Sequence, residues 1–115
     1  MLKVVLFANG ILVHACMYVE GQYHDWCIAD EQTPDDELVL ATKWACENGA
    51  DCTKIQENQP CYHPNTVTQH ASYAFNSYYQ NMKLKGATCY FNSAAVLTAR
   101  DPSKFLSLFA SRDSS

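Results

Sequence analysis

The six cysteines of this 115-residue chain constrain its fold more than any other feature. They lie at positions 16, 27, 46, 52, 61 and 89. A chain of this length forms one domain with a modest hydrophobic core, and small exported domains often compensate with disulfide bridges. Each bridge contributes about 2–4 kcal/mol, which is a large share of the stability of a small domain. We therefore expect a single domain stapled by disulfides.

The N-terminus has the pattern of an export signal. A short positive start precedes the apolar run VVLFANGILV at residues 4–13, which is too short to span a bilayer. Small residues suited to cleavage follow at Ala15 and Gly21. We expect residues 1–21 to be a signal peptide, residues 22–110 a domain and residues 111–115 a tail. The alternative is that the apolar run forms a buried strand or helix.

The charge of the chain excludes several classes of partner. The net charge is −4, and eight basic residues are scattered along the sequence, so no basic surface suits nucleic acid or anionic lipid. No later segment is long enough for a transmembrane helix, and the C-terminus lacks the apolar tail of a lipid-anchor signal. We expect a secreted monomer without a cofactor.

A first helix is predicted to begin at Thr33 and to end at Asn48-Gly49, a pair that favours a left-handed stop. Pro34 suits the first helical position, and the three acidic residues after it face the positive end of the helix dipole. Residues 22–32 before this helix are predicted to be an irregular lead-in, and residues 51–64 after it a loop.

A second helix is predicted to begin with the capping box Thr66–Gln69 and to run to about Lys83, before Gly86. Its core stripe is Val67, Ala71, Ala74, Phe75, Tyr78 and Met82. A second stripe, rich in amides, is Gln69, Tyr73, Asn76 and Gln80. With short strands predicted at residues 87–92 and 94–98, the class is α+β with much coil.

The segment at residues 61–80 holds four tyrosines and one phenylalanine but no Asp, Glu, Lys or Arg. The apolar faces of sugars stack on aromatic rings, and amides can both donate hydrogen bonds to hydroxyls and accept them. This composition favours a neutral carbohydrate as the ligand. The residues predicted to bind it are Tyr62, Tyr73, Asn76, Tyr79 and Gln80, with Asn65 and Gln69 as extensions. The alternative is that the tyrosines pack against loops.

A series of short motifs occurs in the order found in one family. They are Trp26-Cys27, Trp44-Ala45-Cys46, Ala50-Asp51-Cys52, Ile55-Gln56, Cys61-Tyr62, Pro64-Asn65-Thr66-Val67, His70-Ala71-Ser72-Tyr73-Ala74-Phe75-Asn76, Tyr78-Tyr79-Gln80, Cys89-Tyr90-Phe91 and Asp101-Pro102-Ser103. With this series the chain closely resembles the X8 domain, carbohydrate-binding module family 43, over residues 26–103.

The resemblance implies two packed helices with a small antiparallel sheet and long coils. It also implies binding to β-1,3-glucans such as callose or laminarin in the plant cell wall, with plasmodesmata as one location. Catalysis is not expected, because glycosidases use two carboxylates and no Asp or Glu occurs between Glu57 and Asp101.

The resemblance further implies which cysteines pair, namely Cys27 with Cys89 and Cys46 with Cys52. The family partner of Cys61 would follow the Asp-Pro-Ser motif, where this chain has Ser107. We expect Cys61 to be unpaired, and the alternative is a bridge to Cys16 after cleavage at Ala15. The alternative function is that of a secreted structural or partner-binding X8-like protein that has lost glucan affinity with this cysteine.

Two further features are given structural roles. Trp26 and Trp44 adjoin cysteines that are expected to be bridged, so both are predicted to lie in the core. Cys61, His63 and His70 do not have the spacing of a structural zinc site, and we expect no metal.

Overall fold

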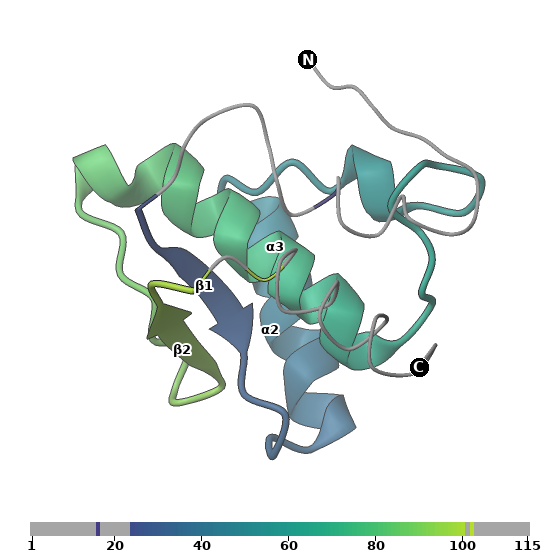
Figure 1. Cartoon of the computed structure of the whole chain (residues 1–115), viewed down its shortest axis with the longest axis horizontal. Helices are drawn as coiled ribbons and strands as arrows, with labels where there is room; N and C mark the ends of the chain where they lie inside the picture. The colour runs from purple at the N-terminus through teal and green to yellow at the C-terminus, as the bar shows by residue number, and fades with distance from the viewer. Residues whose placement is uncertain (1–15, 17–23, 101, 103–115) are drawn as a thin grey trace, which may run out of the picture.

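The computed structural model describes Cys16, residues 24–100 and Pro102. The elements are β1 (Trp26–Ala29), α2 (Asp35–Glu47), the 3-10 helix η1 (Thr53–Ile55), α3 (Val67–Met82), the 3-10 helix η2 (Lys83–Lys85) and β2 (Ala95–Thr98). Helices α2 and α3 pack together, and the sheet of β1 and β2 lies against α3 (Figure 1). The predicted α+β architecture is confirmed. Apart from Cys16, the predicted signal peptide lies outside the described residues, as do Ser107 and the predicted tail.

Helix α2 begins one residue later than Pro34 would suggest. Pro34 is the N-cap residue, with an extended ψ of 146°, and the acidic first turn starts at Asp35. Acidic side chains at this end are favourable because the helix dipole is positive there. The helix ends at Glu47, and Gly49 takes the left-handed φ of 135° that the sequence predicts for the stop.

Helix α3 agrees with its predicted start. The side chain of Thr66 accepts a hydrogen bond from the backbone N–H of Gln69 at 3.1 Å. Ala71, Ala74 and Phe75 are fully buried, so the predicted core stripe supplies the centre of the hydrophobic core.

The sheet corrects one sequence prediction. Its two strands are antiparallel and pair Trp26 with Thr98 and Ala29 with Ala95. The predicted strand at residues 94–98 is therefore real, but its partner comes from the predicted irregular lead-in. Residues 87–92 do not form a strand, because Phe91 and Asn92 have positive φ angles of 50° and 55°.

Three disulfide bridges staple the fold, joining Cys27 to Cys89, Cys46 to Cys52 and Cys16 to Cys61. The first two are the bridges that the family resemblance implies. The prediction that Cys61 is unpaired is wrong. The Cα atoms of Cys16 and Cys61 lie 5.6 Å apart, a normal distance for a bridge, so an N-terminal cysteine takes the place of the missing C-terminal one.

No helix within the described residues is both long and apolar enough to cross a membrane.

Candidate functional site

Two residues of the predicted amide-rich stripe, Asn76 and Gln80, face the β1 segment instead of solvent. Strand β1 pairs with β2 along one edge, so the N–H groups of Cys27 and Ala29 on its other edge need partners. The Oδ1 atom of Asn76 accepts from Cys27 N at 3.0 Å, and the Oγ atom of Ser72 accepts from Ala29 N at 2.9 Å. The Nε2 atom of Gln80 donates to the carbonyl oxygen of Asp25 at 2.8 Å and to Asn76 Oδ1 at 3.0 Å.

The exposed position predicted for Asn76 is therefore wrong, since its side chain is 5% exposed. Ser72, Asn76 and Gln80 repeat every four residues, so they share one helix face and run along the strand. The amides of Asn76 and Gln80, which could bind sugar hydroxyls, bind backbone groups of Cys27 and Asp25 instead. Sequence periodicity placed these two amides on one helix face but could not show that a strand covers it, nor that Ser72 belongs to the same face.

The predicted tyrosines lie half-buried around α3. The hydroxyl of Tyr79 donates to Asp25 at 3.5 Å, and Lys83 Nζ lies 5.3 Å from the Tyr79 ring centre. Burial first, and the neighbouring Asp25 carboxylate second, raise the pKa of Tyr79. The ring of Tyr62 contacts those of His63 and His70, with centroids 5.0 Å and 5.4 Å away. Sugar binding by Tyr62, Tyr73 and Tyr79 stays a prediction.

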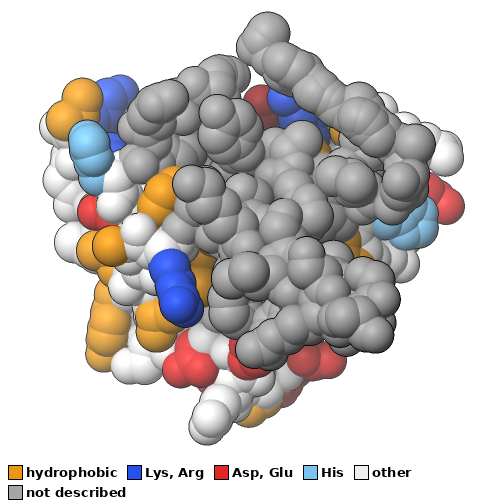
Figure 2. All heavy atoms as spheres, viewed as in Figure 1, with side chains coloured by type: hydrophobic (Ala, Val, Ile, Leu, Met, Phe, Trp, Pro, Cys, Tyr) orange, Lys and Arg blue, Asp and Glu red, His pale blue; other side chains and the backbone are white. Residues whose placement is uncertain are grey.

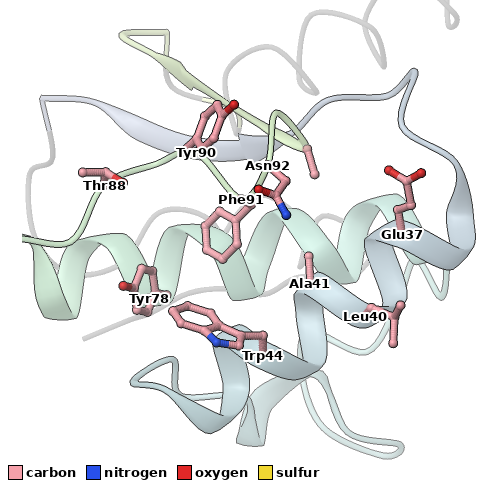
Figure 3. A pocket seen from close by; sticks show the side chains of 10 residues that line it. Glu37, Leu40, Ala41, Trp44, Tyr78, Thr88, Tyr90, Phe91 and Asn92 are labelled. Atoms are coloured by element: carbon pink, nitrogen blue, oxygen red, sulfur yellow. The ribbon is translucent and has the colours of Figure 1, made fainter.

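A different feature has the shape of a binding site. A groove of about 560 Å³ opens between α2, the end of α3 and the loop at residues 87–94. Its lining residues are Glu37, Leu40, Ala41, Trp44, Tyr78, Thr88, Tyr90, Phe91, Asn92 and Ala94. Figure 3 shows Trp44 and Tyr90 on opposite sides of it, with Phe91 between them.

Three of the four aromatic rings that line the groove, those of Trp44, Tyr78 and Phe91, contact one another. Phe91 stacks on the buried Phe75, with ring centroids 4.1 Å apart and an interplanar angle of 13°. Trp44 meets Tyr78 edge-on at 5.1 Å and Phe91 edge-on at 5.9 Å, with angles of 68° and 80°. Tyr78 and Phe91 are also edge-on, at 73°. Such edge-on and stacked pairs are favourable geometries, so these three rings support one another in the groove wall.

The prediction that Trp44 is a core residue is wrong, because 46% of it is exposed. Its neighbour Ala45 points into the core instead and is fully buried. Trp26, by contrast, is buried as predicted. Tyr90 is 59% exposed on the facing wall. The sequence signal that could have found this site is Leu40 and Trp44, two large apolar residues four positions apart on α2 that both stay exposed.

Polar groups accompany the rings. Asn92 and Thr88 bring an amide and a hydroxyl from the loop, and Glu37 brings a carboxylate from α2. Glu37 and Thr88 lie toward opposite ends of the groove in Figure 3. Apolar rings with a few polar groups at their edge are what a sugar requires, because its ring faces are apolar and its hydroxyls lie around the rim.

The loop that carries Tyr90 and Phe91 is held at two points. The Cys27–Cys89 bridge ties its start to β1, and Ala94 N donates to Phe91 O at 2.9 Å. Phe91, Asn92 and Ser93 all have left-handed φ angles, of 50°, 55° and 70°. Residues other than glycine rarely adopt this backbone conformation. Here it turns the ring of Phe91 onto that of Phe75.

Comparison with known proteins gives consistent relatives. A family model described as the X8 domain matches residues 25–96. The chain is 45% identical over 107 residues to glucan endo-1,3-beta-glucosidase 4 of Arabidopsis thaliana, covering 86% of this chain and 21% of that protein. It is 43% identical over 99 residues to plasmodesmata callose-binding protein 4 of the same organism, covering 86% of this chain and 43% of that protein. No solved structure matches the chain significantly.

The chain thus spans about a fifth of the glucosidase and less than half of the callose-binding protein. What it shares with both is one module and not a whole enzyme. Since the family model covers well over half of its residues, this protein belongs to the X8 domain family, carbohydrate-binding module family 43.

Proposed function

We propose that this protein binds β-1,3-glucan of the callose or laminarin type in the groove between Trp44 and Tyr90, without cleaving it. The observation that carries the proposal is the open groove of about 560 Å³ walled by four aromatic side chains. Family membership and a relative named for callose binding support the same ligand class.

The arrangement of the rings favours a β-1,3-linked chain over a β-1,4-linked one. A β-1,4-glucan is a flat ribbon, and a flat row of rings in one plane suits it. Trp44, Tyr78 and Phe91 stand at 68–80° to one another, so they cannot form such a plane. A β-1,3-glucan curls, and a curled chain presents sugar faces at different angles, as these rings require.

The chemistry of the groove supports binding without hydrolysis. Glycosidases place two carboxylates across the scissile bond. Among the residues that line the groove, Glu37 is the one carboxylate. The similarity to glucan endo-1,3-beta-glucosidases 4 and 12 covers 21% and 15% of those proteins.

The proposed setting is the plant cell wall outside the plasma membrane, with plasmodesmata as one location. Three disulfides suit an oxidising compartment, and the relatives include plasmodesmata callose-binding proteins 4 and 5. In this setting the partner is the polysaccharide itself.

Affinity electrophoresis of the secreted protein tests the function. Laminarin in the gel is expected to retard the protein, whereas an uncharged cellulose ether at the same concentration is not. Incubation of pure protein with laminarin is expected to release no new reducing ends. Equal mobility in gels with and without laminarin would disprove glucan binding, and new reducing ends would disprove the absence of catalysis.

A further inference from the structure

Glu37 is the one formally charged side chain among the ten residues that line the groove. It lies in the first turn of α2, and Ala41 and Trp44 follow at i+4 and i+7 on the same side of the helix. Seven residues of helix span about 10 Å, which is close to the screening length of about 10 Å at 0.1 M salt. The carboxylate can therefore act electrostatically on a ligand stacked at Trp44.

The surroundings strengthen the negative potential at this end of the groove. Asp35 and Asp36 share the first turn of α2 with Glu37 but do not line the groove. Figure 2 shows acidic side chains along the lower part of the molecule, where Figure 1 places the start of α2. The chain as a whole carries a net charge of −4.

On the basis of the glucan-binding function proposed above, we propose that Glu37 determines specificity, admitting uncharged sugars and rejecting sugars that carry carboxylates. An ionised carboxylate is an acceptor for hydroxyl donors, and such charge-assisted hydrogen bonds are short and strong. A uronic acid brings a second carboxylate, which has no proton to donate and repels the first. Selection by an introduced repulsion is a common route to specificity.

Calorimetric titration with two matched ligands tests the proposal. One is a neutral β-1,3-gluco-oligosaccharide, and the other is the same oligosaccharide oxidised to uronic acid at its primary hydroxyls. The native protein is expected to prefer the neutral ligand by about tenfold, and E37Q to reduce that preference to about twofold. The matched control is D35N, which removes the same charge from the same helix turn outside the groove and is expected to keep the native preference.

A second measurement does not depend on glucan binding. Trp44 is 46% exposed and Trp26 is 8% exposed, so quenching of tryptophan fluorescence reports mainly on the groove. At a constant ionic strength of about 0.1 M, E37Q is expected to increase quenching by iodide about twofold and to leave quenching by neutral acrylamide unchanged. D35N is expected to change iodide quenching less, and about 1 M salt should remove the difference because the screening length falls to about 3 Å.

The outcomes separate the two proposals. If the native protein does not bind the neutral oligosaccharide, the glucan-binding function is overturned. The quenching experiment then still decides whether Glu37 repels anions from the groove. A native protein that binds both oligosaccharides equally overturns the specificity proposal. So does iodide quenching that is the same in E37Q as in the native protein, or that changes equally in D35N.

Discussion

At the scale of single residues, neighbouring positions have opposite roles. On α2, Trp44 opens onto the groove while Ala45 is fully buried. On α3, Phe75 is fully buried beneath the groove, and Asn76 closes a backbone hydrogen bond of β1. Adjacent helix positions differ by about 100°, so one step along the chain separates the groove wall from the hydrophobic core.

Trp44→Ala tests the groove. The substitution removes the ring that faces Tyr90, and we expect laminarin affinity to fall about tenfold, which corresponds to about 1.4 kcal/mol. Affinity electrophoresis over a range of laminarin concentrations measures the loss. Tyr73→Ala is the comparison, because the sequence predicts Tyr73 as a ligand residue while the groove does not include it. If Tyr73→Ala lowers laminarin affinity more than Trp44→Ala does, the binding site lies on the surface of α3 and not in the groove.

Asn76→Ala tests the structural role of the amide stripe. The substitution leaves the N–H of Cys27 buried without its acceptor, and we expect a loss of about 1–3 kcal/mol in the free energy of unfolding. Urea unfolding followed by circular dichroism measures it. The control is Asn81→Ala, which removes an exposed hydrogen bond to the carbonyl of Gly49 and should cost less. Equal losses in the two variants would contradict the role given to Asn76.

At the scale of elements, the sequence predicted helices better than strands or the site. The helices follow from local signals, such as the Thr66 cap and the buried spacing of Ala71, Ala74 and Phe75. The strand β1 has four residues, and its place depends on a distant partner strand and on side chains of α3. The groove depends on three segments far apart in sequence, so no local pattern could reveal it.

The loop at residues 87–94 is the element whose anchoring should matter most for the proposed glucan binding. Replacing both Cys27 and Cys89 by Ala is expected to lower laminarin affinity at least tenfold, because Tyr90 and Phe91 lose their fixed position. Replacing both Cys16 and Cys61 is the matched control. It opens a loop of similar size, with a separation of 45 residues against 62, on residues that do not line the groove.

Each double variant is expected to lose about 2–4 kcal/mol of stability, since bridges of similar span constrain the unfolded chain similarly. Binding is therefore compared at a temperature where circular dichroism shows both variants folded. Loss of laminarin retention in both variants to the same extent would mean that the bridge acts through general stability and not through the loop.

At the scale of the whole molecule, the bridge between Cys16 and Cys61 bears on processing. It connects the N-terminal region to the loop before α3, and it can persist in the exported protein if the signal is cut before Cys16. We therefore propose cleavage after Ala15 and not after Gly21. Peptide mapping of the secreted protein under non-reducing conditions should show the Cys16 peptide linked to the Cys61 peptide. A mature N-terminus at Gln22 together with a reactive thiol at Cys61 would contradict this.

The hydrogen bonds between β1 and side chains of α3 limit self-association through the edge of the sheet. An open strand edge is a template on which another extended chain can add, and such addition leads to aggregation. Ser72 and Asn76 occupy the N–H groups that an incoming strand would need on that side of β1, and Gln80 occupies the carbonyl of Asp25 just before the strand. The sheet is therefore closed to growth at this border, so copies of this small module cannot join there into fibrils even when many are held close together.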